Sequence, residues 1–420
     1  METKVAKIKV AKSKVAKTTK ATKTAIASGS DNTSDATEAT IAAIATTAAI
    51  TKSINQDIDL CLLKYINDST GIAVDNIDIN IDDATQAIYD VLNNNDCELY
   101  IENIRNRVSD IKDYRKELKV LLQLPLMKQR TTEWFEARKT RLTASDLYDA
   151  VKGGNVSIRL AKKKANIVVD NINYNAIPAL KWGTMFEPMA TRCYSQRMNN
   201  IAIHDFGLIC DTTNEHFGAS PDGINELGIM LEIKCPYSRK IEDGIIPDKY
   251  RMQIQGQLAV CKLKECDYIE CIFKSIENEE DYLELDINID NYVVKHGVIA
   301  EFYNQKGEYV YFYSDPNKTP RECADDITNI RDSILNGNSD GDSDDSSSTE
   351  KLKFSKYTYW KLDDMIIQRV VFNANEWETI IPKINTFWEN VEEYKMLPIE
   401  IGIKKYKFVD DDEEDIVGSK

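Results

Sequence analysis

The stretch GASPDGINELGIMLEIKC, residues 218–235, places three charged side chains within two short, otherwise apolar segments. In its second half, IMLEIKC, the alternation of a β-strand puts Leu231 and Ile233 on one face. The same alternation puts Glu232 and Lys234 together on the opposite face. The sequence therefore predicts a strand with one apolar face and one face that carries an acid beside a base.

The third charge, Asp222, belongs to the first half of the stretch. It follows Pro221, which fixes the backbone, and precedes Gly223, which permits a sharp turn. A hairpin of the two halves would bring Asp222 beside Glu232, and two such carboxylates repel each other unless a cation lies between them. Oxygen ligands of this kind suit Mg²⁺ or Mn²⁺, and the neighbouring Lys234 can position a water or stabilise charge on a phosphoryl oxygen. The alternative is an exposed strand face with a surface ion pair, which contributes little.

The segment RTTEWFEARKTRLTASDLYDAVKGG, residues 130–154, precedes this hairpin. It predicts a helix with Trp134, a basic turn, and a second helix that ends at Gly153-Gly154. Ser145 is the expected N-cap of the second helix, and a helix N-terminus binds anions through its free N–H groups. The alternative for Ser145 is capping alone.

Two further segments contribute polar side chains at helical spacing. ALKWGTMFEPMATRCYSQR, residues 179–197, contains Glu187, and we expect the helix to begin or kink at the proline that follows it. YRMQIQGQLAV, residues 250–260, places Gln253 and Gln257 one turn apart on the same helical face. Gln257 is interpreted either as an active-site residue or as a solvated one.

Taken in chain order, these blocks resemble the YqaJ-type viral recombinase family, related to the phage lambda exonuclease and part of the PD-(D/E)XK nuclease superfamily. The resemblance covers about residues 125–275, and more weakly the chain up to 396. It implies an α/β fold, with a mixed central sheet flanked by helices. The blocks that carry it are R-x₆-S at 138–145, WG-x₃-E-x₂-A at 182–190, SPDG at 220–223, LEIKCP at 231–236 and YxxQxQ at 250–255.

The resemblance assigns roles to individual residues. Asp222 and Glu232 match the metal-binding carboxylates, and the carbonyl of Ile233 matches a further ligand. Glu187 matches the helix glutamate that reaches a second metal ion. Lys234 matches the lysine that orients the attacking water. The implied cofactor is a pair of Mg²⁺ or Mn²⁺ ions, and we expect no iron–sulfur cluster because no set of four cysteines flanks this region.

The resemblance also implies how DNA is held. Gln253 matches the active-site glutamine of the family. Arg138, Ser145 and Ser220 match residues that hold a terminal 5′-phosphate. The implied activity is a metal-dependent exonuclease that degrades double-stranded DNA from 5′ ends during viral recombination, repair or DNA processing. The alternatives are an endonuclease or flap nuclease on the same core, and a catalytically silent DNA-binding recombination scaffold.

Charge is distributed unevenly along the chain of 420 residues, whose formal net charge is −16. Residues 1–30 carry eight lysines against one acid, while residues 121–274 carry 21 basic against 18 acidic residues. An acidic protein can therefore still present a basic working surface. The distribution of residue types along the chain predicts a Lys/Thr/Ala-rich disordered tail (1–54), a helical region (55–124) and a nuclease core (125–275). After the core we expect an insertion (276–355) with a disordered linker (336–350), C-terminal strands and a helix that complete the core (356–400), and an acidic tail (401–420).

Within the C-terminal part, residues 356–372 are interpreted as a hairpin or long strand pair, and residues 375–394 as an amphipathic helix that ends near 396. The nine cysteines show no metal-ligand or disulfide spacing, which favours free thiols in a reducing compartment. No run of 18 apolar residues predicts a membrane span, and no secretory signal is found. We expect an intracellular homo-oligomer in the host cytoplasm or nucleus, acting on double-stranded DNA with a recombinase or helicase partner. Trp182 and Phe186 are expected in the core, and His204, His216 and His296 are expected to be structural.

Overall fold

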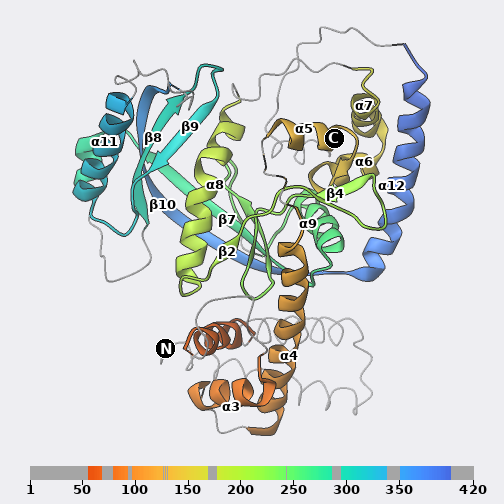
Figure 1. Ribbon diagram of the computed structural model, residues 1–420, viewed down its shortest axis with the longest axis horizontal. Helices are drawn as coiled ribbons and strands as arrows, with labels where there is room; N and C mark the ends of the chain where they lie inside the picture. Colours follow the sequence, from red (N-terminus) through yellow and green to blue (C-terminus); the bar gives the residue numbers. More distant parts are fainter. Residues whose placement is uncertain are drawn as a thin grey trace, which may run out of the picture. The chain divides into compact units, whose positions relative to one another are not determined.

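The hairpin predicted around residues 218–235 is present in the computed structural model (Figure 1). Strand β5 (Gly223–Asn225) pairs antiparallel with β6 (Met230–Lys234), and Gly223 lies opposite Leu231. The turn between them is tight, because the N–H of Gly228 donates to the carbonyl of Asn225 at 2.8 Å. Gly228 has a φ of 76°, a left-handed conformation that glycine adopts without strain.

The chain divides into two compact units, Met1–Lys116 and Glu117–Lys420. In the first unit the described residues form a helix over 55–68, then α3 (Ile81–Leu92) and most of α4 (Cys97–Leu122). The predicted tails and most of the predicted linker lie outside the described residues. The structure describes residues 55–68, 79–92, 97–125, 127, 129, 131–168, 177–242, 244–285, 295–337 and 351–398.

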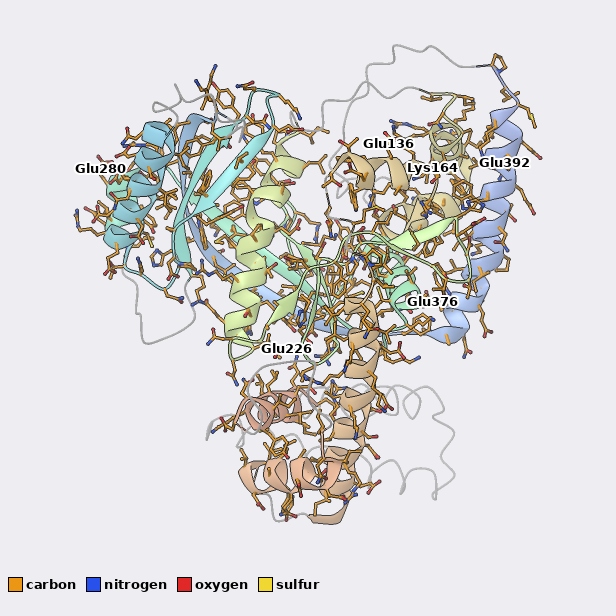
Figure 2. The ribbon with its side chains drawn as sticks, in the orientation of Figure 1. Glu136, Lys164, Glu226, Glu280, Glu376 and Glu392 are labelled. Carbon is orange, nitrogen blue, oxygen red and sulfur yellow. The ribbon has the colours of Figure 1, made fainter. Side chains whose placement is uncertain are left out.

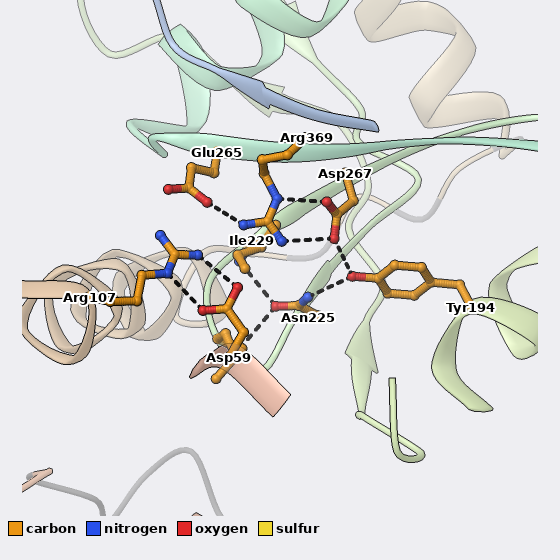
Figure 3. Close-up of polar contacts among 9 residues, drawn as sticks. Asp59, Arg107, Tyr194, Asn225, Ile229, Glu265, Asp267 and Arg369 are labelled. Carbon is orange, nitrogen blue, oxygen red and sulfur yellow. Dashed lines mark hydrogen bonds and ion pairs between the residues drawn. The ribbon is translucent and has the colours of Figure 1, made fainter. Parts of the chain in front are cut away.

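A buried ion pair joins two helices of the first unit. The guanidinium of Arg107 donates to both carboxylate oxygens of Asp59, at 2.7 and 2.8 Å (Figure 3). Both side chains are buried, so the pair replaces the hydrogen bonds that either group would make with water. Apolar side chains such as Leu62 and Ile104 complete this small core.

The second unit is built on a mixed sheet of seven strands, in the order β2-β5-β6-β7-β10-β8-β9. Strand β6 pairs parallel with β7 (Glu265–Ile276), and the connection between them includes helix α9 (Asp248–Cys261). Helix α8 (Pro178–Arg197) packs on the same two strands (Figure 1). This architecture confirms the predicted fold class, a mixed central sheet flanked by helices.

Strand alternation separates the two helices onto opposite faces of β7. Tyr194 of α8 bonds to Asp267, whereas Tyr250 of α9 packs near the ring of Tyr268. Adjacent residues of a strand point to opposite faces, so α8 and α9 cover different sides of the sheet. Glu232, which pairs in register with Tyr268, faces α9.

The C-terminal strand differs from the predicted hairpin. Residues 353–371 form one strand, β10 (Lys353–Val371), which pairs with β8 (His296–Tyr303) in its first part and with β7 along most of its length (Figure 1). The two acids at 363–364, which interrupt the apolar pattern, fall at a shift of register between Leu362 and Asp364 rather than at a turn. Their segment holds neither glycine nor proline, so the strand bends instead of reversing.

The region between β7 and β10 extends this sheet. Strand β9 (Tyr309–Tyr313) pairs antiparallel with β8 at one edge, and helix α11 (Pro320–Gly337) packs on β8. A short helix, α10 (Glu279–Leu283), follows β7. After β10, the predicted amphipathic helix is present as α12 (Ala374–Lys395), and its end agrees with the prediction.

A second, small sheet has the order β1-β4-β3, with β1 (Leu142–Thr143), β4 (Phe217–Ala219) and β3 (Ile209–Cys210). Strand β2 (Ile203–His204) pairs with β5 in the main sheet. The chain passes from β4 to β5 through residues 220–222, so the SPD motif connects the small sheet to the main sheet. Helix α5 (Thr132–Lys139) precedes β1, and the helices η2 (Ala144–Asp146), α6 (Leu147–Lys152) and α7 (Gly154–Lys164) follow it.

The structure answers one half of the expectation that helix α8 begins or kinks at Pro188, and the kink stays a prediction. The helix begins at Pro178, which suits the first helical position, and not at Pro188, which lies inside it. Phe186 is buried in the core as predicted, stacked on Phe273 with ring centroids 4.4 Å apart. Trp182, half-buried, contacts the Phe186 ring.

None of the described helices is long and apolar enough to cross a membrane. The cysteines with described side chains are free thiols, and most of them are buried; Cys210 is exposed. His296 is buried and hydrogen-bonded to Tyr282, at 2.8 Å from its Nδ1.

Candidate active site

The hairpin places Asp222 beside the backbone of β6. The N–H of Ile233 donates to Oδ2 of Asp222 at 2.7 Å, which fixes this carboxylate next to Glu232. Gly223 serves a different purpose from the predicted turn, because it lies in β5 and its φ is not positive. A Cβ atom there would come within 2.6 Å of Ile203, so the glycine allows β2 to approach β5.

Glu232 is fully buried and is held by two side chains. Lys234 donates to its Oε1, and Gln257 of α9 donates to its Oε2 at 2.8 Å. The other amide atom of Gln257, Oε1, is buried and has no hydrogen-bond partner among the described residues. Glu232, Lys234 and Gln257 therefore form one polar cluster on the α9 face of the sheet.

In the structure, Gln257 is the glutamine that is hydrogen-bonded to Glu232, and the role of Gln253 stays a prediction. Gln253, the residue that the family motif indicates, is half-buried one helical turn earlier, and its side chain makes no hydrogen bond within the described part of the chain. Helical spacing alone places both glutamines on one face, so it could not distinguish them. The distinguishing fact is that Gln257 is buried against β6, where it reaches Glu232.

Burial and like charges raise the pKa of Asp222 well above its usual range. Loss of water is the largest cause, followed by repulsion from Glu232 and then from Glu187. Lys234 and the N–H of Ile233 act in the opposite direction but do not cancel these effects. The site therefore concentrates negative charge that its own residues do not fully balance.

Lys234 remains positively charged in this setting. Burial lowers its pKa, but attraction from Glu232 and Asp222 more than offsets burial, so that its pKa is raised. Its ammonium also lies over the ring of Tyr250, with Nζ 4.8 Å from the centroid. These contacts hold the lysine head beside the two carboxylates.

Glu187 approaches the same place from helix α8. It is half-buried, and it is near enough to raise the pKa of both Asp222 and Cys235. Among the described residues, however, no group of three or more His, Cys, Asp or Glu side chains is arranged to hold a metal ion. The donor chemistry, hard carboxylate oxygens with unbalanced charge, fits Mg²⁺ or Mn²⁺.

The three residues matched to phosphate binding form a connected set. Arg138 donates to the Oγ of Ser145 at 3.1 Å, and its guanidinium lies 4.3 Å from the ring centroid of Trp134. Trp134 in turn donates from Nε1 to the Oγ of Ser220 at 3.2 Å. Trp134, which sequence reasoning placed on a helix without a role, thus links Arg138 to Ser220.

The predicted N-cap at Ser145 is wrong. Ser145 lies within the short helix η2, and neither η2 nor α6 has a side-chain cap. Its hydroxyl instead contacts Arg138 and, at 3.0 Å, the hydroxyl of Thr143. Ser145 therefore belongs to the arginine site and not to a helix terminus.

Two residues that the sequence analysis missed, Asp146 and Lys164, interact with Arg138. Lys164, labelled in Figure 2, lies 3.3 Å from the carboxylate of Asp146 and donates to the carbonyl of Arg138 at 2.9 Å. Burial lowers the pKa of Arg138 while Asp146 raises it, and attraction from Lys164 and Arg138 more than offsets burial to lower the pKa of Asp146. One acid thus stabilises two cations and leaves the group with a net positive charge.

A second buried acid shares the face of Glu232 and Lys234. Glu270 of β7 lies opposite Lys234 in the parallel register and is fully buried. It accepts hydrogen bonds from Arg239 and, at 2.8 Å, from Tyr268. The alternation of β7 could have indicated it, because Tyr268 and Glu270 occupy the positions paired with Glu232 and Lys234.

Comparison with known families agrees with the motifs. Residues 133–264 match the YqaJ-like viral recombinase domain, which confirms the resemblance drawn from the sequence. The matched range contains both the Arg138 group and the Asp222–Glu232–Lys234 cluster.

Two viral proteins are similar to this chain. An uncharacterized protein of Acanthamoeba polyphaga mimivirus is 25% identical over 341 residues, which cover 71% of this chain and 58% of the relative. A protein of African swine fever virus is 28% identical over 179 residues, which cover 35% of this chain and 50% of the relative. The chain thus spans between about half and three-fifths of the length of these relatives.

Solved structures similar to this chain include two bacterial exonucleases. An alkaline exonuclease from Laribacter hongkongensis, also solved with dAMP, is 19% identical with a TM-score of 0.37, covering 63% of this chain and 93% of its own. A phage-related exonuclease from Haemophilus somnus is 13% identical with a TM-score of 0.31, covering 61% of this chain and 93% of its own.

Proposed function

We propose that this chain is a metal-dependent deoxyribonuclease that hydrolyses double-stranded DNA from 5′ ends. The observation that carries the proposal is the convergence of Asp222, Glu232 and Lys234 on one end of the β5–β6 hairpin, with Gln257 behind them. Two carboxylates and a lysine held together in this way suit phosphodiester hydrolysis. The YqaJ-like domain over residues 133–264 supports the same activity.

Asp222, Glu232 and the carbonyl of Ile233 would hold a divalent cation, with Glu187 approaching from α8. The cation, when bound, supplies charge neutralisation and an acidified water for attack on phosphorus. The raised pKa of Asp222 supports this assignment, because a cation would offset the repulsion that raises it. A second ion, Mg²⁺ or Mn²⁺ like the first, is part of the proposal through Glu187.

Lys234 then acts on the water and the phosphate. Lys234 is charged and already rests against Glu232, so its ammonium can orient a water or stabilise a phosphoryl oxygen. Gln257 holds Glu232 from the other side, and its own Oε1 is buried without a hydrogen-bond partner among the described residues. Each side chain thereby fixes one oxygen of Glu232.

The Arg138 group supports the proposal that degradation starts at 5′ ends. Arg138 presents a planar fork of donors, which suits a phosphate, and Ser145 and Ser220 add hydroxyls within the same connected set. A terminal phosphate carries more charge than an internal diester, so this group favours a 5′-phosphorylated end. Relatives in large DNA viruses support a role in viral recombination, repair or DNA processing.

The test uses purified protein, Mn²⁺ and three substrates: linear duplex labelled at its 5′ ends, the same duplex labelled at its 3′ ends, and a covalently closed circle. We expect early release of the 5′ label as mononucleotide, late release of the 3′ label, and an intact circle. Cleavage of the circle would support the endonuclease alternative. Absence of cleavage, with DNA still bound, would support a silent scaffold. The Asp222→Asn protein serves as the control for contaminating nuclease.

A further inference from the structure

A buried polar network lies on the α8 face of the sheet, away from Glu232 and Lys234 (Figure 3). Its centre is the hydroxyl of Tyr194, which donates to Oδ2 of Asp267 at 2.7 Å and accepts from Nδ2 of Asn225 at 3.0 Å. The three side chains come from α8, β7 and the end of β5, and all are almost completely buried. One hydroxyl therefore ties the helix to two strands.

Asn225 connects this network to the catalytic hairpin. Its Oδ1 accepts from the N–H groups of Leu227 and Ile229, at 3.0 and 3.1 Å, which fixes the turn between β5 and β6. The register of that hairpin sets Asp222 beside Glu232. The Tyr194 hydroxyl thus holds the element that presents both carboxylates.

Asp267 gives the network a defined direction of hydrogen bonding. Arg369 of β10 donates from Nε to Oδ1 of Asp267 at 2.6 Å and from Nη2 to Oδ2 at 3.2 Å, so both oxygens of this carboxylate accept hydrogen bonds from the guanidinium. Tyr194 must therefore donate to Asp267 and accept from Asn225. Burial and Asp267 raise the pKa of Tyr194, which agrees with a hydroxyl that stays protonated.

The same helix carries Glu187, two turns before Tyr194 and hence on the same face. Pro188 has no N–H, so the helix lacks the backbone bond that would reach the carbonyl of Thr184. The helix is weakened where Glu187 projects, and its position depends more on anchors elsewhere. Tyr194 is such an anchor, and it is joined to the hairpin that carries the other carboxylates.

We propose that Tyr194 is a positioning residue: its hydroxyl fixes Glu187 of α8 relative to the Asp222–Glu232 hairpin, and so sets the geometry in which the three acids bind metal. This inference rests on the proposed function, since it concerns the same metal site. Tyr194 itself touches neither substrate nor metal. Losing its hydroxyl should therefore weaken metal use and turnover without weakening DNA binding.

The experiment compares Tyr194→Phe with a matched control, Tyr282→Phe. Both tyrosines are fully buried and both hydroxyls make a buried hydrogen bond, but Tyr282 bonds to His296 and packs in the separate core between β8 and α11. We expect Tyr194→Phe to lower kcat on 5′-phosphorylated duplex by about tenfold to a hundredfold, the cost of a small misplacement. The KM for DNA should stay within about twofold, because the lost group acts on the reacting geometry alone.

Metal use provides a second readout that does not depend on turnover. Tyr194→Phe should weaken Mn²⁺ binding by about tenfold, measured without DNA by the electron paramagnetic resonance signal of free Mn²⁺. Tyr282→Phe should leave both kcat and Mn²⁺ affinity within about twofold of the wild type. All assays are run well below the unfolding temperatures, which circular dichroism provides.

Equal losses of kcat and Mn²⁺ affinity in the two variants would mean that Tyr194 only stabilises the fold, and would overturn the proposal. Unchanged kcat and Mn²⁺ affinity in Tyr194→Phe would overturn it as well. Failure of the proposed function would appear differently, as an inactive wild-type protein. In that case the Mn²⁺ affinities of the two variants still decide the inference, and a wild type that binds no Mn²⁺ overturns both.

Discussion

The two faces of the β6–β7 strand pair both hold buried acids, but the acids differ in the charge of the group next to them. On the α8 face, Asp267 receives hydrogen bonds to both oxygens from Arg369, which also pairs with Glu265 (Figure 3). On the opposite side, Asp222 lies against Glu232, and burial and repulsion raise its pKa well above the usual range. Asp267 is paired directly with a cation, a balanced arrangement, whereas Asp222 faces a second carboxylate, an unbalanced one.

This difference distinguishes a structural group from a functional one. A buried acid that is paired with a cation contributes to folding, since mutating one partner of such a pair lowers the free energy of unfolding by about 3–5 kcal/mol. Neighbouring carboxylates without a full counter-charge lower stability in the metal-free protein, and such perturbed groups gather at functional sites. The first unit offers a parallel for the balanced case in the buried Asp59–Arg107 pair.

The largest expected effect is the loss of DNA hydrolysis when Asp222 is substituted. Asp222→Asn should lower DNA hydrolysis by about a thousandfold or more, because it removes a metal ligand that acts throughout the reaction. It should leave the unfolding temperature unchanged or raise it, since the charged form of Asp222 is disfavoured by burial and by Glu232. Activity assays and thermal unfolding followed by circular dichroism provide the two measurements.

The matched change on the other face is Asp267→Asn. It removes the charge that Arg369 faces while keeping the shape of the side chain, and we expect a loss of about 3 kcal/mol in the free energy of unfolding. Urea titration measures it. Equal destabilisation by Asp222→Asn and Asp267→Asn would show that the two faces do not differ as argued.

A second prediction concerns Lys234, the base of the unbalanced face. Lys234→Met keeps most of the side-chain volume but removes the ammonium, and kcat should fall by about a hundredfold to a thousandfold. Mn²⁺ binding should persist, because Lys234 is not a ligand and its loss frees Oε1 of Glu232. Single-turnover cleavage and Mn²⁺ titration separate the two effects, and a near wild-type rate would remove Lys234 from catalysis.

The third prediction tests the Arg138 group. Wild-type protein should degrade a 5′-phosphorylated duplex about tenfold faster than a 5′-hydroxyl duplex, the scale of one charge-assisted hydrogen bond. Arg138→Ala should remove most of this ratio, whereas Lys139→Ala, a neighbouring cation paired with Glu136 on the exposed side of α5, should preserve it. Equal rates on the two ends in the wild type would favour the endonuclease.

Sequence periodicity was sufficient to predict the hairpin, but it could not predict which residues of other elements contact the hairpin. The alternation of Leu231, Glu232, Ile233 and Lys234 determines which side chains share a face, and the hairpin then brings in Asp222. The roles of the site residues stay predictions. No local rule indicated Gln257 over Gln253, because that choice depends on where α9 docks against β6.

Two other differences have the same origin in tertiary context. Asp363 and Asp364 resemble turn residues, but pairing with β7 and β8 on either side turns them into an irregularity within one strand. Ser145 has the composition of an N-cap, yet Arg138 and Thr143 take its hydroxyl. In both cases a partner distant in the chain, or a neighbouring side chain, outweighs the local preference.

The smallest expected effect concerns a third buried polar group, His296, whose environment holds no catalytic carboxylate. Burial, aided by Lys295, lowers the pKa of His296 to about 4, although a hydrogen bond that involves the backbone of Lys318 acts in the opposite direction. An unfolded histidine titrates near about 6.5, so the unfolded chain binds the proton first as the pH falls. His296 should thus cost no stability above that pH and should lower it progressively between about pH 6.5 and 4. Thermal unfolding of wild type and His296→Gln across this range should show a shallower pH dependence in the variant, and parallel curves would mean that folding does not lower the pKa of His296.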